Sequence, residues 1–88
     1  MSKVFHTVKK ILNEQYSIQL NQIQPEAKFE LELGVDSREF FELITDFEKA
    51  FNIEIVVEDI VDIITIQEAV SYIEERLILQ NNSNKNSI

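Results

Sequence analysis

The sequence predicts an all-α fold, a small four-helix bundle with three long helices, one short helix and a long first loop. Its 88 residues, 44% of them hydrophobic, suffice for one small core. Apolar residues recur at helical spacing in three separate segments, and only residues 52–65 alternate as a strand would. A lone strand leaves its backbone groups unpaired, so we expect an extended loop there.

The first predicted helix covers residues 3–15, where Val4, Val8 and Ile11 recur on one face and Ser2 is available as the N-cap. A long polar loop with the only proline of the chain follows it. Scattered apolar residues of this loop are expected to pack over the core. They are Leu20, Ile23, Ala27, Phe29, Leu31 and Leu33.

The second predicted helix covers residues 37–51 and carries one continuous apolar stripe. The stripe consists of Phe40, Leu43, Ile44, Phe47 and Phe51. Asp36 and Glu39 have the spacing of a capping box at its start. Phe41 lies off the stripe, and we expect it to be exposed and available to a partner.

The rest of the chain predicts a short helical turn over residues 58–62 and a final helix that ends at about residue 79. Thr65 and Glu68 form a capping box at the start of that helix. Residues 80–88 are polar, and we expect a disordered tail there. The expected domain therefore covers residues 1–79.

Composition excludes several classes of protein. No cysteine is present and His6 is the only histidine, so we expect no disulfide, no thiolate or histidine metal centre and no metal ligands. No apolar run approaches the about 18 residues of a membrane span, and no secretory signal is visible, so we expect a cytosolic monomer.

Negative charge is concentrated in residues 25–62, which hold twelve acids against three bases. Such a field repels nucleic acid and anionic lipid and attracts basic protein surfaces. It is consistent with a solubility coat or with a docking surface. The acids lie around Ser37, which favours docking.

Enzyme chemistry finds little support in the sequence. One glycine cannot build a phosphate-cradling loop. A hydrolase that used Ser37 would need a base beside it, and the one conventional candidate, His6, lies among lysines on the first helix. We therefore expect a protein that is not an enzyme.

The most informative segment is residues 32–37, which contains the only glycine, Gly34, followed by Asp36 and Ser37. Glycine frees the backbone just before a helix begins, and the serine hydroxyl then stands at the helix mouth. That geometry suits a serine modified by another protein. Together with the pattern downstream, the segment resembles the acyl carrier protein family over residues 3–78. The matching stretches are residues 23–29, 33–37, 41–43, 51–55, 63–69 and 72–73.

The resemblance implies a 4′-phosphopantetheine arm on Ser37, transferred from coenzyme A by a separate magnesium-dependent transferase. Asp36 matches the family's motif acid. A chain without cysteine fits this role, because the thiol of a thioester must then come with the arm. Acyl chains of the family fold back into the bundle core. The implied partners are phosphopantetheinyl transferase and acyl-transferring or ketosynthase-type enzymes with basic docking surfaces.

The residues expected to contact those partners lie on the second helix: Arg38, Glu39, Phe41, Glu42, Asp46 and Glu48. Arg38 stands where the family usually has Leu or Met, and Phe40 and Phe41 are bulkier than usual. These departures point toward a specialised polyketide, lipid or peptide pathway as much as toward fatty-acid synthesis. Two other interpretations remain: an unmodified acidic helical interaction module with Ser37 as a helix cap, and a peptidyl or aminoacyl carrier.

Overall fold

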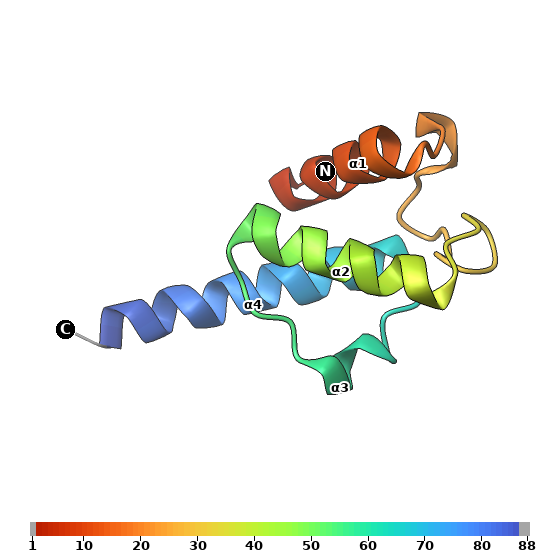
Figure 1. Cartoon of the computed structure of the whole chain (residues 1–88). Coiled ribbons are helices and arrows are strands. Elements are labelled where there is room, and N and C mark those ends of the chain that lie inside the picture. The colour runs from red at the N-terminus through yellow and green to blue at the C-terminus, as the bar shows by residue number, and fades with distance from the viewer. Residues whose placement is uncertain (1, 87–88) are drawn as a thin grey trace.

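The structure, a computed structural model, describes residues 2–86, with side chains for residues 2–80. The elements run in the order α1 (Lys3–Tyr16), η1 (Leu20–Gln22), α2 (Ser37–Phe51), α3 (Val57–Ile60) and α4 (Ile66–Asn86) (Figure 1). Over these residues the only β pairing is an isolated antiparallel bridge between Lys28 and Thr65. The predicted all-α fold is confirmed, with three long helices and one short one.

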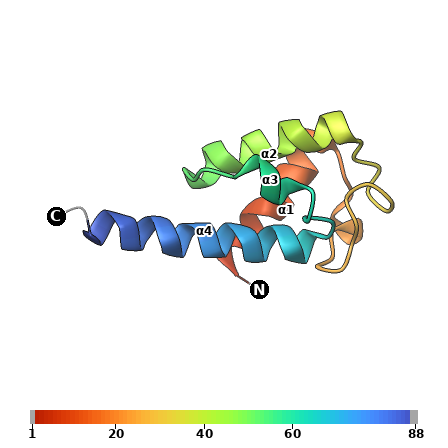
Figure 2. The same cartoon turned by 90° about the horizontal axis from the view of Figure 1, so that it is seen from below.

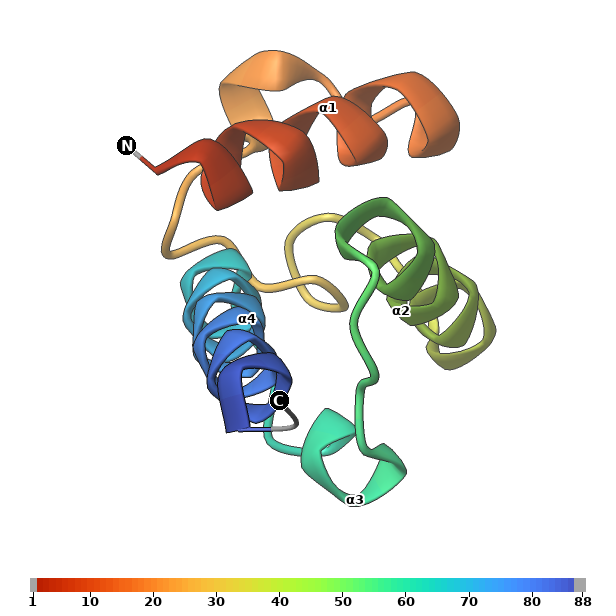
Figure 3. The same cartoon turned by 90° about the vertical axis from the view of Figure 1, so that its left-hand side faces the viewer.

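The helices surround a single core. Viewed from the side on which α4 ends, α1 crosses over α2 and α4, and α3 closes the opposite side (Figure 3). The side chains at the centre of the core are at most 1% exposed, and each contributes about 1.5–3 kcal/mol by leaving water. The largest of them are Val8, Leu12, Ile23, Leu43, Phe47, Ile66 and Ile73.

The N-capping residues in the sequence correctly predicted where the three long helices begin. The Ser2 side chain accepts a hydrogen bond from the Phe5 N–H at 3.1 Å, which caps α1. At the start of α4, the Glu68 N–H donates to Thr65 Oγ1 at 3.1 Å. Glu68 Oε1 in turn accepts from the N–H groups of Thr65 and Ile64, both at 2.9 Å, and these bonds lower the pKa of the Glu68 carboxyl.

The first loop differs in part from its prediction. Four of its six apolar anchors pack on the core as expected: Ile23, Ala27, Phe29 and Leu33. Leu20 and Leu31 do not, with 53% and 76% of their surface exposed. Leu20 lies in the unpredicted 3-10 turn η1. Leu31 lies within a tight turn in which two N–H groups, of Glu32 and Leu33, bond the Lys28 carbonyl at 3.0 Å, so its side chain points outward.

The final helix is longer than the sequence predicted. It continues past residue 79 to Asn86, beyond the rest of the bundle (Figure 2). A helix that has begun adds one backbone bond per residue, so polar residues can prolong it at little cost. Gln80 Nε2 also donates to the Asn52 carbonyl at 2.7 Å, and Arg76 Nε to the Glu54 carbonyl at 3.0 Å. The predicted end of the helix near residue 79 is therefore wrong, whereas the disorder of the tail stays a prediction, and residues 87–88 lie outside the described part.

The chain between α2 and α4 is an extended loop followed by the short α3, as predicted, although α3 begins one residue before the expected turn. Tyr72 of α4 holds this segment. Its hydroxyl donates to Asp59 Oδ2 at 2.7 Å and accepts from the Val56 N–H at 3.1 Å. On the other side of the bundle, the Tyr16 hydroxyl donates to Asp46 Oδ2 at 2.6 Å and joins α1 to α2.

Both tyrosine hydroxyls should lose their protons at a higher pH than a free tyrosine does. Burial, followed by the hydrogen bond to the aspartate, raises the pKa of Tyr16 and of Tyr72 above its ordinary value of 10.0. A raised folded pKa means that the contribution of each phenol to stability is complete below pH 10 and is lost as the pH rises through the folded value. The chain has two tyrosines and no tryptophan, so absorbance at about 295 nm reports both phenols.

We expect the phenolate transition of the folded protein to lie at higher pH than the same transition in denaturant. Tyr72→Phe should leave the shifted Tyr16 transition in place. A folded-state transition at the same pH as in denaturant, with the helical circular dichroism intact, would contradict the hydrogen-bonded, half-buried phenols.

Candidate functional site

Ser37 is the first residue of α2, and the residue before it caps the helix. Asp36 Oδ1 accepts from the Glu39 N–H at 2.8 Å, and Glu39 Oε1 accepts from the Asp36 N–H at 3.3 Å. The predicted capping box is therefore present. Asp36 is the N-cap residue, so the interpretation of Ser37 as the cap of α2 is wrong. The Ser37 side chain is exposed, and its hydroxyl does not cap the helix.

The loop before Ser37 is fixed by backbone bonds. Gly34 has a φ of 71°, in the left-handed region where a side chain would be strained. The Val35 N–H donates to the Phe29 carbonyl at 2.9 Å, and the Phe29 N–H donates to the Ile64 carbonyl at 3.0 Å. These bonds attach the loop to the segment that leads into α4 and so set the position of Ser37.

The environment of the Ser37 hydroxyl suits an anion. The first N–H groups of a 15-residue helix have no intrahelical acceptor, and the positive end of the helix dipole points at them. The exposed guanidinium of Arg38 is the next side chain along. Within the described residues, Ser37 Oγ makes no hydrogen bond to a base, and no group of three or more His, Asp or Glu side chains is arranged to hold a metal.

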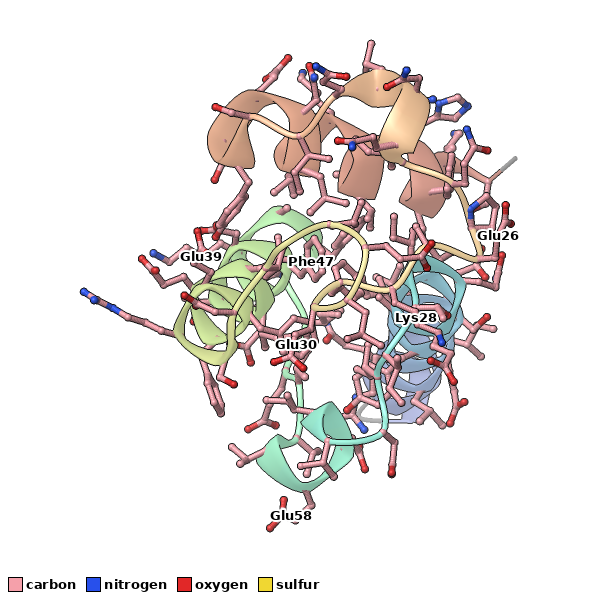
Figure 4. The ribbon with its side chains drawn as sticks, turned by 90° about the vertical axis from the view of Figure 1, so that its right-hand side faces the viewer. Glu26, Lys28, Glu30, Glu39, Phe47 and Glu58 are labelled. Carbon is pink, nitrogen blue, oxygen red and sulfur yellow. The ribbon has the colours of Figure 1, made fainter. Side chains whose placement is uncertain are left out.

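A pocket of about 420 Å³ opens beside Ser37, between the first loop, the start of α2 and the segment that contains α3. In Figure 4, Glu30 on the first loop faces the space between α2 and α3, while Glu58 points away from it. The lining is mostly apolar: Lys28, Phe29, Glu30, Leu31, Val35, Asp36, Ser37, Phe40, Phe41, Ile60, Val61, Ile63 and Ile64.

None of the lining residues in the segment 60–64 was predicted to belong to the site, although Ile63 and Ile64 lie in one of the stretches that match the family. A signal for them existed, because four of the five residues in this short stretch are apolar, more than one turn of helix can bury on one face. Val61 and Ile64 are indeed 78% and 53% exposed, and both face the pocket.

The predicted partner-contact residues divide into two places. Glu39, Glu42 and Asp46 form one row on α2, and all three carboxylates help to raise the pKa of the Tyr16 phenol, after burial and the hydrogen bond to Asp46. Glu48 lies elsewhere, because residues two apart on a helix do not share a face. Its Oε2 accepts from the Ile55 N–H at 2.8 Å in the loop after α2.

Exposure also separates these residues. Arg38 and Glu42 are exposed, and Phe41 is 53% exposed, as predicted for a contact residue. Glu39, Asp46 and Glu48 are half-buried, and each bonds a group of the chain itself. Of the four predicted docking carboxylates, Glu42 is thus the one exposed side chain.

Comparison with known proteins agrees with this geometry. A family model described as a phosphopantetheine attachment site matches residues 6–73, more than half of the chain. The solved structure of the acyl carrier protein from Enterococcus faecalis is similar, with a TM-score of 0.72 and 30% sequence identity over 84% of this chain and 94% of that one. This chain belongs to the acyl carrier protein family. Its cofactor is a covalently attached 4′-phosphopantetheine.

The residues of this carrier protein fit that group. An exposed serine hydroxyl stands at the start of a long helix, where backbone N–H groups can face a phosphodiester, and an apolar pocket lies beside it. When attached, the group supplies the thiol on which an acyl chain is held as a thioester. Family members interact with phosphopantetheinyl transferases and synthase enzymes. No helix over residues 2–86 has the length and apolar character needed to cross a bilayer.

Proposed function

We propose that Ser37 is the attachment residue and that the protein carries acyl groups between enzymes without catalysing a reaction itself. In the loading step, Ser37 Oγ forms a bond to the phosphorus that bears pantetheine in coenzyme A. The bond from that phosphorus to the adenosine bisphosphate breaks, and the hydroxyl proton leaves. The position of Ser37 carries the proposal: it is exposed, it is not needed as a cap, and it lines the apolar pocket.

Asp36 has a second proposed role besides capping. Its Oδ1 accepts from the Glu39 N–H, whereas Oδ2 makes no hydrogen bond to the part of the chain that the structure describes, and the side chain is exposed beside Ser37. Such a carboxylate can help to hold the magnesium ion of the transferase or face its basic surface.

The pocket supports an apolar acyl cargo, because its lining is mostly hydrophobic and a charged group would lose hydration there. Fatty-acid synthesis or a specialised polyketide or lipid pathway would supply such chains, and Arg38, Phe40 and Phe41 favour the specialised role. A cytosolic location and a monomeric state stay predictions.

The test is an intact mass spectrum after incubation with coenzyme A, Mg²⁺ and a promiscuous phosphopantetheinyl transferase. We expect a gain of one phosphopantetheinyl group, which fragmentation places on Ser37. A chain that stays unmodified with that transferase and with the transferase of its own host, or a group found on another serine, would reject the proposal.

We further propose that partners dock on α2 beside Ser37, through Phe41, Arg38 and Glu42. Phe41 offers exposed apolar area, and the exposed carboxylate of Glu42 makes no hydrogen bond within the described residues. Glu39, Asp46 and Glu48 contribute to the negative field, although their internal bonds restrict their orientation. Rim charges of this kind act mainly on the rate of encounter.

Glu42→Gln should lower kcat/KM for loading by the transferase several-fold at low salt, and the loss should vanish at ~0.5 M salt, where exposed charges are screened. The matched control is Glu75→Gln, which removes the same charge from an exposed site on α4. Equal losses in both variants would mean that only the net charge matters, and an unscreened loss would point away from electrostatics.

A further inference from the structure

Two phenylalanines that line the pocket pack against each other. Phe29 and Phe40 pack with their ring centroids 5.2 Å apart at 53° between the ring planes, and both line the pocket. Phe29 comes from the first loop and is 3% exposed, whereas Phe40 is half-buried on α2, three residues after Ser37. Because Phe29 belongs to the first loop and Phe40 to α2, the pair of rings bridges the space between that loop and that helix.

The pocket does not reach the centre of the core. Leu43 and Phe47 follow Phe40 along the same stripe of α2, are fully buried and are absent from the pocket lining. Residues three and four apart on a helix lie one above the other on one face. A chain that enters beside Ser37 and follows this stripe therefore meets the Phe29–Phe40 pair before it meets the core.

We infer that the Phe29–Phe40 pair sets the longest acyl chain that this protein can shelter. This inference rests on the proposed function of Ser37. The cargo class that the pocket would select is a straight apolar chain of limited length. Methylene groups of the acyl chain that reach as far as the aromatic pair leave water on entering the pocket. Methylene groups beyond that point stay outside, because displacing the close-packed rings costs free energy.

The test is to load straight-chain acyl groups, from butanoyl to dodecanoyl, onto Ser37 with a promiscuous transferase and the matching acyl-coenzyme A. The mass of each product is confirmed before its Tm is measured. Each sheltered methylene should raise Tm by up to about 6 °C, because the cargo is covalent and its burial adds to the folded state. In the parent, Tm should rise with chain length and then stop rising before dodecanoyl.

Phe40→Leu should move that stopping point to a longer chain, because the smaller side chain opens the wall. Phe51→Leu is the matched control, since Phe51 is also half-buried on the α2 stripe but does not line the pocket. It should lower every Tm and leave the stopping point unchanged.

The inference is overturned if Tm in the parent ignores chain length, if it still rises at dodecanoyl, or if Phe40→Leu and Phe51→Leu behave alike. Absence of loading in the mass spectra instead rejects the proposed function, and the inference falls with it. The two failures are thus told apart by the spectra alone.

Discussion

Ser37→Ala should abolish attachment of phosphopantetheine while leaving stability within about 0.5 kcal/mol of the parent. The loss of loading is complete, because Ser37 carries the one hydroxyl among the residues that line the pocket at the start of α2. The unchanged stability follows from the capping box, in which Asp36, and not Ser37, accepts the bond from the Glu39 N–H. Intact mass and urea unfolding measure the two quantities on the same samples.

Two variants serve as controls, one for loading and one for stability. Ser71→Ala removes an exposed serine in α4 and should load like the parent. Asp36→Ala should cost about 0.5–2 kcal/mol, because it removes the cap. If Ser37→Ala were destabilised as much as Asp36→Ala, the hydroxyl would be structural after all, and retained loading in Ser37→Ala would remove it as the attachment site.

Phe47→Ala should destabilise the protein by about 3–5 kcal/mol, the largest stability effect that we expect from one substitution. Phe47 is fully buried and lies at the centre of the stripe by which α2 packs on the core. The cost combines the lost burial of the ring with the cavity that remains. Since small domains have a total stability of about 5–15 kcal/mol, this variant should be partly unfolded in mild denaturant.

Urea unfolding followed by circular dichroism measures this loss. The control is Phe41→Ala on the same helix, where an exposed ring is removed and the change should be small, within about 0.5 kcal/mol. Comparable losses in the two variants would show that the core does not centre on Phe47.

Much of the site could be predicted because its signals are local. The bounds of α2, the capping box of Asp36 and Glu39, and the exposed Phe41 follow from side-chain periodicity and from bonds between residues three apart. The role of Ser37 as a candidate for modification came from the same short segment. The long α4 was missed because the Gln and Asn residues after Leu79 resemble a tail, and the contact of Gln80 with Asn52 joins residues 28 positions apart.

The sequence by itself determined the order of the four helices, the N-caps of the three long ones, the glycine before Ser37 and the family to which the chain belongs. Only the tertiary structure decided which acids stay exposed, because Asp46 bonds Tyr16 only when α1 packs on α2, and Glu48 bonds Ile55 only when the loop after α2 folds back. It also decided the pocket, since Phe29, Phe40 and Ile60 come from three segments that approach one another when the first loop bonds to the start of α4. Periodicity reports neighbours along one helix, whereas a pocket is made by neighbours in space.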